Sequence, residues 1–285
     1  MAVIGVSTVV IAACCWPPDV VLPALAPLLA LAGRAWAYAA SIVLEAAPYI
    51  LVGSLVATLA LRAGANRIAA ALLPMVAPGC DCSMNGYAPL IARAPAPLAA
   101  FSMIWSASCN PIALFATHAI LGAAVFKARI AGTLVAGCLT ALGWSNARLR
   151  PAPSACGAGC RAGRPRAPRS AVEIFGSGLL ALVPAAALCG VALVAAPHVL
   201  RAHAAPLPAA ALGALISPCS TADAILARVL APLPAAQAAF VMAAQTLDAR
   251  QLSLLARTFG MRRAAIAAAA SLIGCAVAVF SVRHP

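Results

Sequence analysis

The sequence contains very few charged side chains. Only 9% of its 285 residues are charged, whereas 64% are hydrophobic. A soluble domain carries about 25% charged and about 45–50% apolar residues, so this chain cannot cover a water-facing surface. Apolar runs near or above the roughly 20 residues that cross a bilayer recur along the chain. The composition therefore predicts an all-α, polytopic membrane protein and excludes a soluble globular domain.

The motifs of several enzyme classes are also missing. The chain has no phosphate-binding loop, no Ser-His-Asp arrangement and no zinc-protease helix, so we expect no enzymatic activity and no cofactor. Acidic residues are scarce: 19 basic against 6 acidic residues give a net charge of +13. Since no basic stripe is interleaved with aromatics, we expect these charges to set orientation in the lipid bilayer and not to bind nucleic acid.

The eleven cysteines do not form the pattern of a disulfide framework. Cys138, Cys189 and Cys275 lie inside apolar segments, where cysteine acts as a small apolar filler. Aromatic residues make up only 5% of the chain, while small residues are abundant, which suits close helix contacts in lipid. We therefore predict no disulfide-stapled domain and no resident metal.

The N-terminus lacks the positive region that begins a signal peptide, because no Lys or Arg precedes Arg34. The sequence Ile11-Ala12-Ala13-Cys14 resembles a lipid-attachment box. We expect residues 1–35 to form an uncleaved N-terminal membrane segment, with cleavage and lipidation as the alternatives.

What the chain does contain is one pattern twice. Pro78-Gly79-Cys80-Asp81-Cys82-Ser83 and Pro218-Cys219-Ser220-Thr221-Ala222-Asp223 are short polar interruptions in apolar sequence. In both copies, 21 positions separate the first cysteine from a Phe-x-Met helix start, at Phe101 and at Phe240. Equivalent interruptions in the two halves of a membrane protein are a sequence sign of a transport site.

These copies indicate two pseudo-symmetric transmembrane repeats, at 36–147 and at 173–285. Residues 148–172 between them hold six arginines and no acidic residue. Because positive loops stay on the cytoplasmic side, we expect this stretch to be a basic cytoplasmic linker.

Charge placement favours a re-entrant or broken helical hairpin in each repeat, at 68–93 and at 208–230. A basic cluster follows the second of them, at Arg257, Arg262 and Arg263. It lies on the cytoplasmic side only if 208–230 enters and leaves the membrane on one face. We therefore expect inverted repeats, and parallel repeats if both segments cross fully. Lys127 and Arg129 count against inversion, because they would lie near the outer face.

A backbone break at membrane depth leaves N–H and C=O groups unpaired unless protein buries it or a wet cavity lines it. We therefore expect the two cysteine-containing breaks to meet near the midplane and line one cavity. The helix after the first break is itself broken by an Asn-Pro pair. The predicted substrate-binding residues are Cys80, Asp81, Cys82, Ser83, Cys109, Asn110, Cys219, Ser220 and Asp223.

The thiols are the sharpest part of this prediction. Cys80, Cys82 and Cys219 offer soft ligands to a thiophilic species, with Cys109 as a fourth member. The alternative is that these cysteines are small, tightly packed turn residues. Zinc sites favour the wider Cys-x2-Cys spacing over Cys-x-Cys.

Two further carboxylates are candidates for energy coupling. Glu45 lies well inside an apolar segment, where an ionisable group costs at least about 2.5 kcal/mol and normally faces a cavity or a partner. Asp248 occupies the place in the second repeat that Cys109 has in the first. The alternatives are wetting of Glu45 by lipid headgroups and a local pair of Asp248 with Arg250.

The hairpin carboxylates, Asp81 and Asp223, are each followed by an arginine in the same hairpin, Arg93 and Arg228. We expect them to line a polar path with internal ion pairs. Helix capping is the other role that Asp near Pro commonly has, and the two roles are compatible.

Four motifs occur in the order and spacing of one membrane-protein family. They are a Glu-x-x-Pro helix at Glu45–Gly53, a cysteine motif at Gly79–Cys82 with Cys109-Asn110-Pro111, a hairpin at Ser220–Ala224 and a final motif at Leu247–Gly260. Over roughly residues 36–280 the chain resembles the predicted permease family that includes the bacterial organoarsenical efflux permeases. The resemblance implies a multi-pass permease of the bacterial plasma membrane.

The sequence thus predicts a secondary transporter that moves a small solute, with a thiophilic metalloid species as the candidate. Two alternatives are a membrane thiol redox protein, in which Cys80 and Cys82 cycle between dithiol and disulfide, and a membrane scaffold without a solute path. The substrate, the direction and coupling of transport, and the formation of a homo-oligomer stay open.

Overall fold

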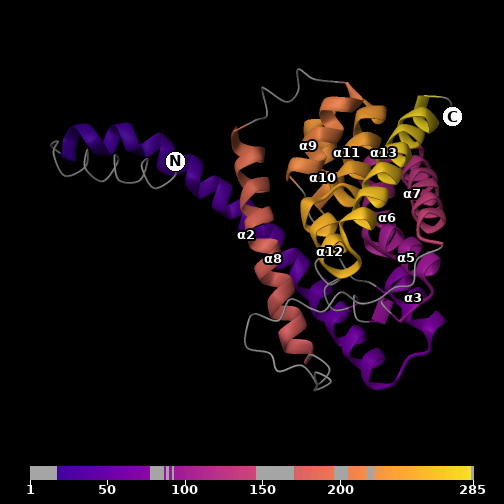
Figure 1. The fold of residues 1–285 in the computed structure, drawn as a ribbon. Coiled ribbons are helices and arrows are strands. Elements are labelled where there is room, and N and C mark those ends of the chain that lie inside the picture. Colours follow the sequence, from indigo (N-terminus) through magenta and orange to yellow (C-terminus); the bar gives the residue numbers. More distant parts are fainter. Residues whose placement is uncertain are drawn as a thin grey trace.

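The computed structural model describes residues 18–77, 87, 90–91, 93–145, 170–195, 205–216, 220 and 222–283. Within these residues the regular elements are helices (Figure 1). In chain order they are α2 (Pro18–Arg62), α3 (Arg67–Val76), α5 (Ala96–Ser108), α6 (Pro111–Leu121), α7 (Ala123–Gly143), α8 (Ala171–Ala195), α9 (Pro206–Ile216), α10 (Ala222–Leu230), α11 (Pro234–Thr246), α12 (Ala249–Phe259) and α13 (Met261–Arg283).

Four helices of the described chain are long and apolar enough to cross a membrane. They are Leu29–Arg62 within α2, the whole of α7, Ala171–Val191 within α8, and the whole of α13. A fifth span arises if α5 and α6, which meet at a bend of 41°, are counted together. The protein is therefore compatible with multi-pass insertion in a membrane, as the composition predicts.

Both interrupted segments begin with a short helix and not with a span. The helix α3 has 10 residues and α9 has 11, about half the length that crosses a bilayer. The apolar stretch 98–120 is divided into α5 and α6, at the predicted Asn-Pro break. The apolar stretch 235–256 is also divided, into α11 and α12, and the sequence did not predict that break.

The long helix α2 packs against α8, and in Figure 1 the two cross on the left of the bundle. They approach closely because Gly190 has no side chain, and a Cβ there would collide with the carbonyl oxygen of Ala35. The described part of the expected N-terminal segment 1–35 is not separate from the first repeat, because α2 continues through residue 35. Most of the expected linker, residues 146–169, lies outside the described residues.

Small residues line the crossing of α7 and α13. A Cβ placed on Gly132 would lie 2.6 Å from the carbonyl oxygen of Gly274, and one on Gly274 would lie 2.5 Å from that of Gly132. Lipid tails are as apolar as leucine, so close backbone packing of this kind is what holds membrane helices together. The close backbone contact between α7 and α13 therefore stabilises the bundle.

Two tight turns depend on glycine. Gly122 joins α6 to α7 with a φ of +86°, and Gly260 joins α12 to α13 with a φ of +97°. Glycine adopts positive φ without strain because it has no Cβ. Each turn brings a short helix back against the long helix that follows it.

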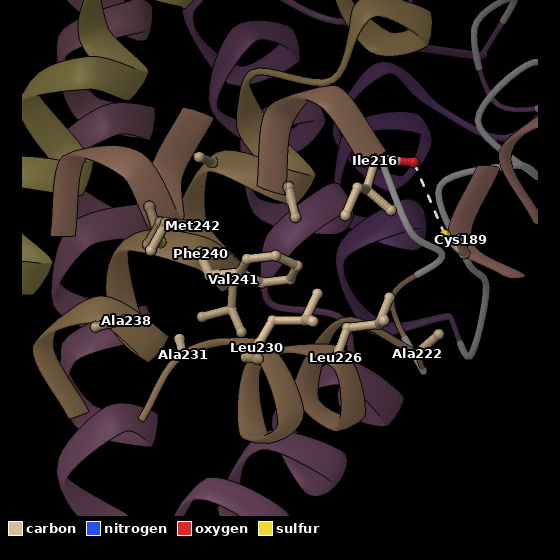
Figure 2. Packing of buried hydrophobic residues seen from close by; sticks show 14 of the residues in the cluster. Cys189, Ile216, Ala222, Leu226, Leu230, Ala231, Ala238, Phe240, Val241 and Met242 are labelled. Carbon is tan, nitrogen blue, oxygen red and sulfur yellow. Dashed lines mark hydrogen bonds between the residues drawn. The ribbon is translucent and has the colours of Figure 1, made fainter. Parts of the chain in front are cut away.

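The buried apolar residues of the described chain form two clusters. The first includes Ile216 and Leu226, which flank the second interruption, and Phe240 and Met242 of α11 (Figure 2). The second cluster includes residues that flank the first interruption, namely Ala77, Tyr87, Leu90 and Ile91. The cysteines of both interruptions lie outside the described residues, so their predicted meeting stays a prediction.

Candidate functional site

The break between α5 and α6 frees backbone groups inside the bundle. Asn110 caps α6: its Oδ1 accepts a hydrogen bond from the backbone N–H of Ala113 at 2.8 Å, and its Nδ2 donates to the carbonyl of Ser106 at 3.3 Å. Because Pro111 has no N–H, the hydrogen-bond ladder of α5 cannot continue through it. The carbonyl oxygen of Ser108, the last residue of α5, accepts its hydrogen bond from another helix.

Arg129 of α7 supplies that donor. Its fully buried side chain donates from Nε to the carbonyl oxygen of Ser108 at 2.6 Å and from Nη1 to Thr117 Oγ1 at 2.7 Å. Its Nη2 lies 2.8 Å from Oδ2 of Asp223 in α10. One guanidinium therefore joins α5, α6, α7 and α10.

Asp223 is also fully buried. It lies in the first turn of α10, where the positive end of the helix dipole favours a carboxylate. Its other polar neighbours are the Gln245 side chain and the backbone N–H of Ala224. Neither carboxylate oxygen makes a well-aligned hydrogen bond within the described residues. The pair with Arg129 is therefore an ionic contact with acceptor capacity to spare.

Ser220 adds a second incompletely used acceptor. It precedes Asp223 by three residues, is fully buried, and its hydroxyl has no hydrogen-bond partner in the described part of the chain. Buried polar groups in folded proteins are almost always paired with protein or water. The Ser220 hydroxyl, close in sequence to the Arg129–Asp223 pair, can therefore accept a hydrogen bond from water or from a polar group of a solute.

Hydroxyl and sulfur groups surround the ion pair. Thr133 Oγ1 donates to Ser108 Oγ at 3.0 Å, and Met242 Sδ lies 3.5 and 3.8 Å from these two oxygens. The thiol of Cys109 lies 4.0 Å from the carbonyl oxygen of Arg129. We name the central polar cluster, whose members are all buried, as Ser108, Cys109, Asn110, Thr117, Arg129, Thr133, Asp223 and Met242.

The structure brings three of the predicted substrate-binding residues, Cys109, Asn110 and Asp223, into this cluster, with Ser220 buried close by in sequence. The other predicted residues lie outside the described residues: Cys80, Asp81, Cys82, Ser83 and Cys219.

The two predicted coupling residues have different surroundings. Glu45 is exposed on α2, within the stretch long enough to span a membrane. Asp248 is buried and directly precedes α12, the position that Asn110 has before α6. Its carbonyl oxygen accepts the backbone N–H of Leu252 at 2.9 Å, so Asp248 begins the helix as a capping residue does.

Arg129 is the important residue that sequence reasoning placed elsewhere, near the outer face. The residues that follow it would have indicated burial, because small and hydroxyl side chains recur every three or four positions and form the buried face of α7: Gly132, Thr133, Ala136, Gly137 and Thr140. Lys127 is off this stripe and is exposed.

The expected pair of Asp223 with Arg228 does not form, and the expected pair of Asp81 with Arg93 is not tested, because Asp81 lies outside the described residues. Arg93 and Arg228 are both exposed. Asp223 pairs instead with Arg129, which comes from the other half of the sequence.

The described residues contain no group of three His, Cys, Asp or Glu side chains that could hold a metal ion. The predicted thiol site for a thiophilic species is outside this test, because Cys80, Cys82 and Cys219 are not among those residues. In comparisons with protein-family models, with curated proteins and with solved structures, nothing matches this chain.

Replacing Asn110 with alanine should destabilise the protein by about 1–2 kcal/mol, because a buried helix end loses its cap. Asn66 is a matched control, since it accepts from Ala69 N at the same 2.8 Å but in an exposed position. Thermal unfolding in detergent should show a clearly smaller loss for Asn66→Ala. Equal losses of stability would mean that the buried cap at the α5–α6 break contributes no more than the exposed cap of α3.

Proposed function

We propose that this chain is a multi-pass permease of the plasma membrane and that its solute passes the central polar cluster. The observation that carries the proposal is the fully buried Arg129–Asp223 ion pair. Arg129 is the seventh residue of the apolar helix α7, so it lies about 9 Å along the axis from the start of that helix. Ionisable residues inside membrane spans are costly, and those that are kept mark solute or ion paths.

The order of helices supports two structural repeats. The helices α3, α5, α6 and α7 have 10, 13, 11 and 21 residues, and α9, α11, α12 and α13 have 11, 13, 11 and 23. The first residues of matched helices are 138 or 139 positions apart, and the glycine turns at Gly122 and Gly260 correspond as well. The repeat boundaries read from the sequence, 36–147 and 173–285, enclose both sets.

One observation favours inverted over parallel repeats, and another removes part of the evidence against them. In Figure 1 the matched helices α3 and α9 lie toward opposite ends of the bundle, as inversion requires. Arg129, which seemed to place a positive charge at the outer face, is buried and paired, so it does not report orientation. Each interruption then forms a re-entrant or broken hairpin that dips toward the centre.

The ion pair connects the two repeats. Ser108 and Thr117, which Arg129 contacts, belong to the first repeat, and Asp223 belongs to the second. In inverted-repeat transporters one repeat moves against the other around a central site. The Arg129–Asp223 contact is therefore one that breaks and re-forms, when Asp223 takes up a proton or when a negatively charged group of the solute binds Arg129.

The sulfur groups suggest the kind of solute. Cys109 and Met242 lie in the central polar cluster, and Cys80, Cys82 and Cys219 belong to the two interruptions. Soft sulfur ligands favour soft metals and metalloids. We therefore keep a thiophilic metalloid species as the candidate solute, with Glu45 and Asp248 as further candidates for proton coupling.

A growth panel of an expressing bacterial strain against arsenicals, antimonials and heavy-metal salts tests this function. Expression should raise resistance to at least one compound, and the double change Cys80→Ser with Cys219→Ser should abolish it at unchanged membrane abundance. Cys138→Ser, which changes an exposed residue of α7, is the control and should be neutral. Full resistance in the double variant removes the thiol mechanism, and no resistance to any compound removes the metalloid substrate.

A further inference from the structure

A cavity of about 600 Å³ lies where α3 and α5 begin, and it shares no residue with the central polar cluster. Its wall combines the turn before α3 with the turn before α5, including Asn66, Arg67, Arg93 and Pro95. Neither the proposed transport path nor the resemblance to permeases gives this cavity a role.

The cavity is positively charged. Arg67 and Arg93 come from turns far apart in sequence and face the same space. No acidic residue lines it, and neither arginine forms a salt bridge within the described residues. The N-terminus of α5 also borders this cavity, and no side chain caps the first backbone N–H groups of that helix. Within the described residues these donors have no anionic partner, and they line one volume.

The cavity lies beside the end of a stretch that is long enough to span a membrane. The spanning stretch of α2 ends at Arg62, and only a short turn separates it from Arg67. Long arginine side chains near the end of a membrane span extend to the level of the lipid headgroups. The two arginines can therefore meet the phosphate layer of the bilayer or a solute of the adjoining aqueous phase.

A second cavity shows that the helix arrangement alone does not make such a cavity rich in arginine. It has about 550 Å³ and lies where α9 and α11 begin, the helices that match α3 and α5. Pro206 stands there where the first cavity has Arg67, and the remaining wall is apolar apart from Arg283 at the end of α13. One member of a matched pair of cavities has thus acquired a pair of arginines.

We propose that the cavity at the start of α3 and α5 binds a phosphate group, namely the phosphodiester of an anionic phospholipid at the membrane surface. Guanidinium groups bind phosphate with two parallel hydrogen bonds, and basic pockets between membrane helices are suited to anionic headgroups. Free inorganic phosphate offers the same chemistry, so the test separates the two sources. The proposal does not depend on the transport function.

The experiment measures binding to the purified full-length chain in neutral detergent by native mass spectrometry. The probes are short-chain phosphatidylglycerol, short-chain phosphatidylcholine and inorganic phosphate. The variants are Arg67→Gln with Arg93→Gln and, as the matched control from the second cavity, Arg283→Gln. If the double variant does not fold, the two single variants replace it.

We expect phosphatidylglycerol to bind the wild type and phosphatidylcholine to bind far more weakly. The double variant should bind phosphatidylglycerol about 25-fold more weakly, at roughly fivefold for each arginine, and Arg283→Gln should bind it within twofold of the wild type. Arginine-dependent binding of inorganic phosphate without phosphatidylglycerol binding supports the phosphate site and assigns it to the aqueous source. Equal binding of both lipids, or undiminished binding by the double variant, overturns the proposal.

Discussion

Arg129→Met is expected to destabilise the folded protein by about 3–5 kcal/mol. The loss is large because the substitution leaves the carboxylate of Asp223 buried without its counter-charge, which costs more than the pair itself contributes. It also removes the donors that the carbonyl of Ser108 and the hydroxyl of Thr117 use. Unfolding of the purified protein by titration with a denaturing detergent measures the change.

The double variant Arg129→Met with Asp223→Leu should recover most of that stability. Replacing both partners of a buried pair by apolar residues is often close to neutral, whereas removal of one partner is not. Recovery will be incomplete because Thr117 and Ser108 still lack a donor. A double variant as unstable as Arg129→Met would show that the Arg129–Asp223 contact does not carry the energetics of the cluster.

Enlarging Gly274 is expected to separate α7 from α13 and to lower stability by about 1–3 kcal/mol or more. Already the single methyl of Gly274→Ala would lie 2.5 Å from the carbonyl oxygen of Gly132, which belongs to a rigid helix backbone and cannot turn away. Because Arg129 lies on the same helix as Gly132, the shift should also disturb the ion pair. Thermal unfolding and membrane abundance of Gly274→Ala and Gly274→Leu measure the effect.

Gly176 is the control for this prediction. It also lies within an apolar helix, α8, but a Cβ there meets no atom within 4 Å. Gly176→Ala should therefore be neutral or slightly stabilising, since alanine has the higher helix propensity. If Gly274→Ala proved as stable as Gly176→Ala, the close approach of α7 and α13 would be wrong.

Local rules predicted part of this site from the sequence. The break at Asn110 was predicted because Pro111 cannot donate to the preceding turn and asparagine is a good cap, and both effects act within a few residues. Asp223 was singled out because a carboxylate is conspicuous in so apolar a chain. Both lie in the central polar cluster.

The pairing of residues far apart in the chain could not be predicted from the sequence. Arg129 was interpreted as a charge near the outer face because it follows closely on the start of an apolar segment that begins there in the inverted arrangement. Its partner lies in the other half of the chain, where no local rule could find it. The small residues of α7 distinguish Arg129 from Lys127 only when those residues are recognised as one buried face of the helix. The break before α12 was missed because no proline marks it, and Asp248 was taken for a coupling group when its position is also that of a cap.

The central claim is that the two interruptions border a water-filled site inside the membrane, and thiol accessibility tests it most directly. The native protein in membranes is treated with a charged, water-soluble methanethiosulfonate, and the modification of each cysteine is measured by peptide mass spectrometry. The account predicts rapid modification of Cys80, Cys82 and Cys219, and none of Cys189 and Cys275, which are buried between helices. If the three interruption cysteines are as unreactive as Cys189 and Cys275, no wet site exists there and the permease mechanism is contradicted.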